Sequence, residues 1–275
     1  MNLINKNYIN KIVKQALEED LKPLGDITTK LINNKKSKAK IIAKQNGIIA
    51  GLDFCKSVFI AVGKETIFSK KIKDGDKINK GKVIAVISAK TKTILTAERT
   101  ALNFLSHASG IATLTKKFVN KSNRKTKICC TRKTTPNLRR LEKYAVKKGG
   151  GFNHRYNLSD EIMIKDNHIN AEVDIKMLIN KAIKTKKNIT LEVESVKQLR
   201  KVLGLKFKRI LFDNMSILNL KRCLKISKSN YETEYSGNVT LKNVSKISKT
   251  GVDRISIGSL THSAKSFDLS LKLLY

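Results

Sequence analysis

The sequence predicts an α/β protein in which a small N-terminal domain is followed by an abbreviated parallel α/β barrel. Short β-type runs dominate the first part of the chain, and strand-like runs alternate with helical ones in the rest. Chemically active side chains also follow most of the later strands, as they do at the mouth of a barrel. We place the domains at residues 1–102 and 103–275, with the C-terminal end able to pack back on the first domain.

The first domain combines helical and strand patterns. Residues 3–19 carry apolar side chains at helical spacing and predict the first helix. Between residues 39 and 94 the β-type runs are KIIAK, GIIAG, KVIAVI and KTIL, and KDGDKINKGK has the composition of tight turns. We therefore expect a small α+β domain.

Residues 95–120 are amphipathic, with apolar side chains recurring three and four positions apart. This pattern predicts one long helix that tolerates Gly110. Arg99 lies within it, either as an ordinary surface arginine beside Glu98 or as a functional residue, and the spacing leaves both interpretations open.

From residue 127 onward, strand-like and helical runs alternate. The predicted strands are ICC, EIMI, ITLEVE, RILF, YETEY and RISI, and the predicted helices cover 137–148, 171–185, 196–203, 216–225 and 241–249. The last four strand ends lie about 22 residues apart, as in successive βα units of a parallel sheet. Residues 103–275 are fewer than the ~250 of a typical eight-fold barrel, so we expect an incomplete one.

The net charge of +35, from 57 basic and 22 acidic residues, suggests a nucleic-acid-binding protein. However, the excess is mostly lysine spread along the chain, and aromatic residues are only 5%, with none placed as a stacking platform. We interpret the charge as a solvated surface shifted by AT-rich codon use, with weak, salt-dependent attraction to polyanions.

The sequence predicts a cytosolic protein. The N-terminus lacks the apolar stretch of a signal peptide, and no apolar run approaches the ~20 residues of a membrane helix. The four cysteines lack zinc-site spacing, so we expect free thiols in a reducing compartment.

Residues 130–169 concentrate basic side chains at predicted strand ends: Arg132, Lys133, Arg139, His154, Arg155, Lys165 and His168. Because burying unpaired charges costs several kcal/mol each, such groups require an anionic partner, and arginine forks match carboxylates and phosphates. The expected ligand carries several negative charges. The two histidines could orient or protonate a carboxylate, or be hydrogen-bonded structural residues.

Two further groups follow later strands. Glu192 and Asp213 could hold Mg²⁺, directly or through water, or could each pair with a lysine at the mouth. The loops at 236–238 and 258–259 open before helices, where backbone N–H groups favour phosphate.

These residues lie in motifs that resemble the quinolinate phosphoribosyltransferase family, also called carboxylating nicotinate-nucleotide pyrophosphorylases. The motifs span nearly the whole chain: GDITT (25–29), TAERTALNFLSHASGIAT (96–113), TRKTTPNLRRLEKYAVKKGGG (131–151), NHR (153–155), IKDNHI (164–169), LEVES (191–195), LFDNMS (211–216), SGN (236–238) and GVDRISIGSLTHS (251–263). The resemblance implies an N-terminal α/β sandwich, an incomplete α/β barrel and a homodimer in which Arg99 is contributed to the partner's site.

The implied reaction joins quinolinate to 5-phosphoribosyl 1-diphosphate with Mg²⁺ as cofactor, giving nicotinate mononucleotide, diphosphate and CO₂ in NAD biosynthesis. The resemblance gives catalytic roles to Lys133, Lys165, Glu192 and Asp213, with the two acidic residues also facing the metal. It implies substrate binding by Arg99, Thr131, Arg132, Lys133, His154, Arg155, Lys165, Glu192, Asp213, Ser236, Gly237, Asn238, Ile257, Gly258 and Ser259.

Three residues depart from the family pattern. Asn137 and Asn238 replace usual glycines and are expected to preserve the backbone, because asparagine tolerates positive φ. Phe152 replaces a usual histidine, and it alters affinity only if that histidine belonged to the pocket.

Alternative functions exist on the same fold. One is a phosphoribosyltransferase for another acid such as nicotinate, or a paralogue associated with molybdenum transport. Another is a polyanion-binding module. The joint presence of Arg132, His154, Arg155 and Lys165 favours a dicarboxylate substrate.

Overall fold

A computed structural model describes residues 4–171 and 174–274, and these residues form two compact units. Unit 1 comprises Met1–Lys116, Thr134–Gly150 and Leu260–Tyr275, and unit 2 comprises Lys117–Lys133 and Gly151–Ser259. The division predicted after residue 102 falls inside helix α3 (Thr91–Lys121). Residue 3 of the first predicted helix and residues 172–173 of the helix predicted over 171–185 lie outside the described residues.

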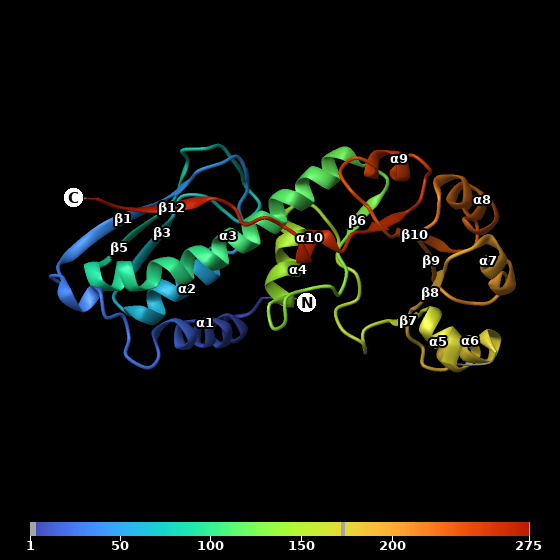
Figure 1. Cartoon of the computed structure of the whole chain (residues 1–275), viewed down its shortest axis with the longest axis horizontal. Helices are drawn as coiled ribbons and strands as arrows, with labels where there is room; N and C mark the ends of the chain where they lie inside the picture. Colours follow the sequence, from blue (N-terminus) through green and yellow to red (C-terminus); the bar gives the residue numbers. More distant parts are fainter. Residues whose placement is uncertain (1–3, 172–173, 275) are drawn as a thin grey trace. The chain divides into compact units, whose positions relative to one another are not determined.

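Unit 1 is built on an antiparallel sheet with strand order β12-β1-β5-β3 (Figure 1). Its strands are β1 (Lys36–Ala43), β3 (Ile67–Lys70), β5 (Val83–Lys90) and β12 (Leu269–Leu274), with a separate pair β2 (Gly47–Ile48) and β4 (Lys77–Ile78). Its helices are α1 (Lys6–Leu21), the 3₁₀ turn η1 (Thr29–Leu31), α2 (Leu52–Val62), most of α3, and α4 (Arg139–Lys148), with the short α10 (Ser259–His262) leading into the last strand. The predicted combination of helices and strands in the first domain is confirmed.

The period of the apolar residues explains these elements. In β1, Ala39, Ile41 and Ala43 are fully buried while Lys40 and Ile42 between them are not, which is the alternation of a half-buried strand. The β-type interpretation of KTIL (92–95) is wrong, because these residues begin α3. Ile94 is fully buried and starts the helical repeat that continues through Ala97 and Ala101.

Unit 2 contains a six-stranded parallel sheet with strand order β6-β11-β10-β9-β8-β7. The strands are β6 (Lys127–Cys129), β7 (Ile162–Ile164), β8 (Ile189–Val193), β9 (Arg209–Asp213), β10 (Glu232–Ser236) and β11 (Arg254–Ser256), and all six were predicted. The helices are α5 (Asp166–Ala171), α6 (Ile175–Ile183), α7 (Val196–Val202), α8 (Ile217–Ser227) and α9 (Val244–Ser248). Within residues 4–171 and 174–274, no ladder joins β6 to β7, so the barrel-like sheet stays open, as expected of an incomplete barrel.

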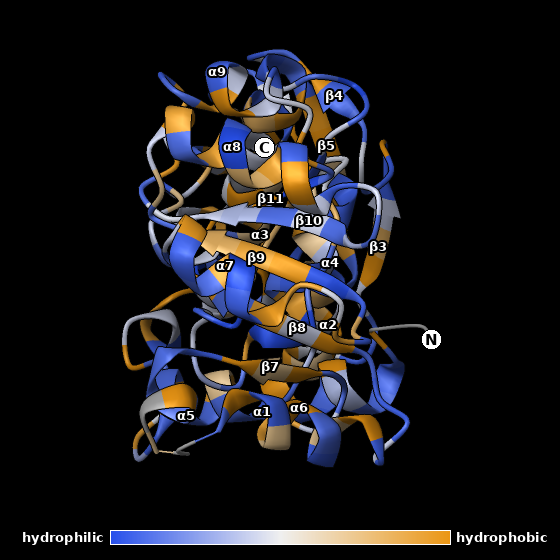
Figure 2. Cartoon of the chain, turned by 90° about the vertical axis from the view of Figure 1, so that its right-hand side faces the viewer, coloured by the Kyte–Doolittle hydropathy of each residue, from blue (hydrophilic) through white to orange (hydrophobic). Residues whose placement is uncertain are grey.

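The strands of unit 2 differ in polarity. Figure 2 shows β9 mostly in hydrophobic colours and β10 mostly in hydrophilic ones. Yet Thr233 and Glu234 of β10 are fully buried, so this strand carries polar groups into the interior of the sheet. Among the described helices, none is long and apolar enough to span a membrane.

Candidate active site

The predicted site residues of unit 2 lie at the carboxyl ends of its parallel strands. Thr131 to Lys133 follow β6, Lys165 follows β7, and Asp213 and Ser236 end β9 and β10 as neighbours in register. Ile257 to Ser259 follow β11, and Ile257 N donates to the Cys129 carbonyl across the adjacent strand at 2.9 Å. Because the ladders are all parallel, these segments share one edge of the sheet.

Lys165 and Glu192 form a direct contact between two predicted site residues. Lys165 Nζ lies 2.8 Å from Glu192 Oε2, and the Glu192 residue is only 7% exposed. Burial raises the pKa of Glu192, the Lys165 ammonium opposes that rise, and the nearby Asp213 carboxylate adds to it. The two acidic residues therefore repel each other at a place that a further cation would stabilise.

Asp213 is tied to the loop after β10 through Asn214. Asn214 Nδ2 donates to Asp213 Oδ2 at 2.9 Å, and Asn238 Nδ2 donates to Asn214 Oδ1 at 3.3 Å. Gly237 has φ +103°, and a Cβ there would collide with the Asn214 side chain. Sequence reasoning missed Asn214, although it stands in the LFDNMS motif directly after Asp213.

The guanidinium of Arg155 is half-buried and is affected by the charge of Arg132, which follows β6. Burial lowers the pKa of Arg155, the charge of Arg132 lowers it further, and Glu161 acts in the opposite direction. Arg155 Nη1 donates to the Glu161 carbonyl at 3.1 Å. Such a pair of like charges suits a ligand that brings at least two negative charges.

The two histidines have different surroundings. His154 is 8% exposed, its Nδ1 accepts from the Arg155 backbone N–H at 2.7 Å, and its Nε2 lies 3.3 Å from Glu234 Oε1. His168 is exposed, and its Nδ1 accepts from the Lys165 backbone N–H at 3.1 Å, at the start of α5. His154 is thus directed toward the interior of unit 2, and His168 supports a helix start.

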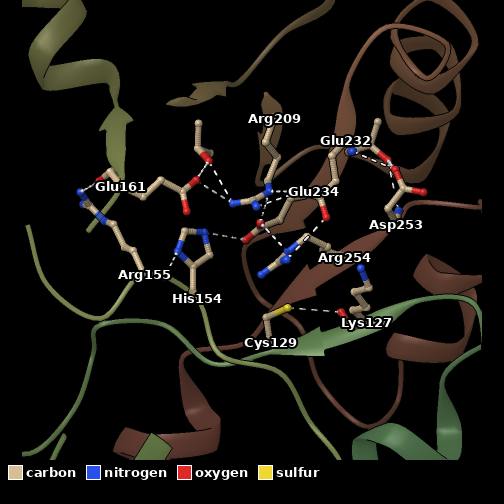
Figure 3. Close-up of polar contacts among 12 residues, drawn as sticks. Lys127, Cys129, His154, Arg155, Glu161, Arg209, Glu232, Glu234, Asp253 and Arg254 are labelled. Carbon is tan, nitrogen blue, oxygen red and sulfur yellow. Dashed lines mark hydrogen bonds and ion pairs between the residues drawn. The ribbon is translucent and has the colours of Figure 1, made fainter. Parts of the chain in front are cut away.

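A buried ion network fills part of that interior and was not predicted (Figure 3). Arg209, at the start of β9, contacts Glu161 and Glu232 at 2.8 Å each, and its Nε lies 3.5 Å from Glu234 Oε2. Arg254 lies 3.3 Å from Glu234 Oε2. Burial would raise the pKa of Glu234, but His154, Arg254 and the Ser256 hydroxyl lower it to about 2.

A sequence signal for this network did exist. Charged residues occupy alternate positions of the YETEY strand, and both neighbouring strands begin with arginine. Side chains two apart in a strand share one face, so Glu232 and Glu234 had to meet a common environment. We define Glu161, Thr190, Arg209, Glu232, Glu234 and Arg254 as the interior cluster.

Arg99 lies on α3 in unit 1 and is exposed. The GDITT motif is fixed against the same helix, because Asp26 accepts hydrogen bonds from Thr29 N at 3.0 Å and Thr96 Oγ1 at 2.9 Å. The Thr29 backbone hydrogen bond is the main cause that lowers the pKa of Asp26. The role predicted for Arg99 in a partner's site stays a prediction.

The departures from the family pattern have local explanations. Asn137 has φ +64° and Asn238 has φ +48°, so the prediction that both keep a left-handed backbone is confirmed. The Phe152 ring is 45% exposed, and Lys127 Nζ lies 5.8 Å from its centroid. Lys127 begins β6, whereas the site residues follow the end of that strand.

Comparison with known proteins agrees with this arrangement. The family model "Quinolinate phosphoribosyl transferase, N-terminal domain" matches residues 26–109, and the corresponding C-terminal domain model matches residues 111–272. The chain is 40% identical over 273 residues to a probable carboxylating nicotinate-nucleotide pyrophosphorylase of Bacillus subtilis, covering 98% of this chain and 94% of that protein. It is also 40% identical over 284 residues to a probable enzyme of the same name from Methanocaldococcus jannaschii, covering 98% of each.

Solved structures show similarity to the same family. The nicotinate-nucleotide pyrophosphorylase from Francisella tularensis superimposes with a TM-score of 0.95 at 35% identity, covering 99% of this chain and 98% of that one. NadC from Streptococcus pyogenes gives a TM-score of 0.94 at 38% identity, with the same coverage. With both of its halves matched, the chain belongs to the quinolinate phosphoribosyl transferase family.

Proposed function

We propose that this protein transfers the phosphoribosyl group of 5-phosphoribosyl 1-diphosphate to quinolinate and decarboxylates the product in NAD biosynthesis. The products are nicotinate mononucleotide, diphosphate and CO₂. The observation that supports the choice of substrate is that the Arg155 guanidinium is held by the Glu161 carbonyl at 3.1 Å, where the positive charge of Arg132 also acts on it. Quinolinate is a dianion with two adjacent carboxylates, and it would neutralise both guanidinium groups.

The transfer step forms a bond between the pyridine nitrogen and C1 of the ribose as the bond to diphosphate breaks. Electron density moves onto the leaving diphosphate, which the backbone N–H groups of residues 236–238 and 257–259 and the Lys133 ammonium would stabilise. Lys165 Nζ lies 2.8 Å from Glu192 Oε2 and places a further positive charge at the same edge of the sheet. No covalent intermediate with the protein is required.

Decarboxylation follows from the charge on the ring. Once its nitrogen is ribosylated, the pyridinium accepts the electron pair left when the adjacent carboxylate departs as CO₂, and a proton then replaces it on the ring carbon. The contribution of the protein is to orient the ring, with Arg132 and Arg155 as the groups that would hold its carboxylates.

We propose that Glu192 and Asp213 would hold a magnesium ion. Their mutual repulsion, which contributes to the raised pKa of Glu192, would be relieved by a divalent cation, and carboxylate oxygens are the ligands Mg²⁺ prefers. When bound with the diphosphate, the ion would supply charge stabilisation for the leaving group.

We also propose a cytoplasmic homodimer in which Arg99 serves the partner's site. The exposure of Arg99 on a helix, with the GDITT loop anchored one turn earlier, supports a role at an interface. Buried thiols at Cys55, Cys129 and Cys223 are compatible with a reducing compartment. Analytical ultracentrifugation would test the dimer, and a stable monomer at active concentrations would refute it.

The assay that tests the function uses purified protein, Mg²⁺, 5-phosphoribosyl 1-diphosphate and carboxyl-labelled quinolinate, with nicotinate in parallel. We expect CO₂ and nicotinate mononucleotide in equal amounts from quinolinate, and no product from nicotinate. Arg132→Ala should lower kcat/KM for quinolinate by about 100-fold, since a desolvated charge-assisted pair is lost. Arg124→Ala is the matched control, because this exposed arginine precedes the start of β6. A folded protein that turns over nicotinate instead would refute the assignment.

A further inference from the structure

Arg155 is a predicted substrate-binding arginine whose contacts lead directly into the interior cluster. Its backbone N–H donates to His154 Nδ1 at 2.7 Å, and its guanidinium Nη1 donates to the Glu161 carbonyl at 3.1 Å. Figure 3 shows Arg155, His154 and Glu161 beside Arg209 and Glu234. Both ends of Arg155 are therefore held by residues that themselves contact buried charges.

The Glu161 carboxylate is held by hydrogen bonds from two neighbouring strands. Its carboxylate accepts from Arg209 Nη1 at 2.8 Å and from the Thr190 hydroxyl, and its side chain is 12% exposed. Thr190 is fully buried on β8, and Arg209 is 4% exposed on β9. Two strands of the sheet thus anchor one carboxylate, and its main-chain carbonyl is presented to Arg155.

Anchoring Glu161 also fixes the position of the Arg155 guanidinium. The charge of Arg132 opposes that of Arg155, and the Glu161 carbonyl is a fixed acceptor that holds the Arg155 guanidinium in place before a dianion arrives. Holding a charged group in place before binding removes the cost of ordering it later. A misplacement of about 1 Å in such a group can cost up to about 100-fold in rate.

We propose that Glu161, anchored by Arg209 and Thr190, is a positioning residue that sets the Arg155 guanidinium for the quinolinate carboxylates. The proposal rests on the function proposed above and adds to it a residue that does not touch substrate. It assigns the main effect to the position of Glu161, because the group that accepts the hydrogen bond from Arg155 is a backbone carbonyl, and the Glu161 carboxylate adds only an electrostatic contribution.

Three variants separate positioning from general stability. Glu161→Ala removes both anchoring contacts. Glu161→Gln keeps an oxygen that can accept from Arg209 and Thr190. Glu232→Gln is the matched control, since Glu232 accepts from the same Arg209, and from Arg254, but belongs to β10 and is not one of the contacts to Arg155 described above.

KM and kcat are measured separately for each variant, and the Kd for quinolinate is measured by titration calorimetry. We expect Glu161→Ala to raise the KM and Kd for quinolinate by about 10- to 100-fold, with kcat and the KM for 5-phosphoribosyl 1-diphosphate within about threefold. Glu161→Gln should restore the KM to within about threefold of the original. Glu232→Gln should lower the melting temperature and leave the KM for quinolinate within the same range.

Thr190→Val provides a second route if Glu161→Ala does not fold. It removes the hydroxyl contact to Glu161 with nearly unchanged shape, and a rise of about three- to tenfold in the KM for quinolinate is expected. An unchanged KM in folded Glu161→Ala, or in Thr190→Val, overturns the positioning role while the proposed function stands. Equal effects of Glu161→Ala and Glu232→Gln also overturn it. A parent protein that neither binds nor converts quinolinate overturns the proposed function instead, and the positioning role with it.

Discussion

Phe152 stands where the family resemblance implies a histidine. The side chain is half-exposed and its ring faces Lys127 at the beginning of β6, while the Phe152 backbone pairs with the end of that strand, its carbonyl accepting from Cys130 N at 3.1 Å. Since the basic site residues follow the end of that strand, an aromatic ring here leaves their charges in place.

Phe152→His is therefore expected to keep kcat/KM for quinolinate within about threefold of the parent value, because surface changes away from special contacts have small effects. The coupled CO₂ and mononucleotide assay measures it. A change of tenfold or more would place this side chain in the pocket.

Gly237 tolerates a larger side chain poorly. Its φ of +103° strains any other residue, and an added Cβ would collide with the Asn214 side chain. Gly237→Ala should raise the KM for 5-phosphoribosyl 1-diphosphate by at least about tenfold, because the loop after β10 must move and strained backbone costs of order 1–3 kcal/mol.

Gly204→Ala separates backbone strain from steric collision, since Gly204 has φ +85° and an added Cβ there would meet nothing within 4 Å. We expect this control to lower the melting temperature with an unchanged KM. If both variants bind the diphosphate donor normally, residues 236–238 do not form a phosphate site.

At the scale of elements, the sequence predicted those parts whose signal is local. All six strands of the parallel sheet follow from short strand-like runs that alternate with helical ones, and the long helix α3 follows from the period of its apolar residues. KTIL was misassigned because a run of three apolar or β-branched residues fits a buried strand and a buried helix start equally well. Only the longer repeat of Ile94, Ala97 and Ala101 distinguishes the two.

The candidate site was predictable at strand ends, because parallel strands bring their ends together whatever the details of packing. The pairing of side chains within the interior cluster could not be predicted from the sequence. Its members pair across four strands, and a single sequence does not state which buried charge meets which. Asn214 was missed for a related reason: its side chain acts on a loop that is distant in sequence.

Strand β10 leads to a prediction about acid stability. The pKa of Glu234 lies at about 2 in the folded protein, below its ordinary value of 4.5, so the unfolded state binds the proton more tightly. Stability from this carboxylate is therefore present above pH 4.5 and is lost as the pH falls toward 2. Urea unfolding between pH 7 and pH 3 should show a decreasing free energy of unfolding.

In Glu234→Gln the fall with pH should be shallower, and stability near pH 7 should drop by about 3–5 kcal/mol, the usual cost of breaking a buried ion pair. An equally steep pH dependence in this variant would show that Glu234 does not carry the effect.

Helix α3 contains a glycine with a packing role. A Cβ on Gly110 would collide with the Lys265 carbonyl, in the segment that precedes β12 within unit 1. Gly110→Ala would gain about 0.5–1 kcal/mol from helix propensity alone. We expect the opposite sign, with a loss of about 1–3 kcal/mol from overpacking, measured by chemical denaturation. A stabilised variant would contradict the close approach.

At the scale of the whole molecule, the net charge of +35 predicts weak binding to polyanions. Because this attraction is due to counterion release, RNA binding should fall by at least about tenfold between 50 and 200 mM salt. Quinolinate turnover uses a small desolvated site and should change by less than about threefold over the same range. Filter binding measures RNA binding at each salt concentration, and the coupled CO₂ and mononucleotide assay measures quinolinate turnover. RNA binding that resists salt would favour a dedicated polyanion site.

The pairing of β12 with β1 has a consequence for protein synthesis. β1 pairs with β12, and all the other strands of the chain that the structure describes lie between these two in sequence. Until β12 has been translated, one edge of β1 has no partner, and an unpaired strand edge can pair with other chains. The antiparallel sheet of unit 1 therefore reaches its final form only after β12 has left the ribosome, and a nascent chain stalled before β12 would be a client for chaperones that shield open strand edges.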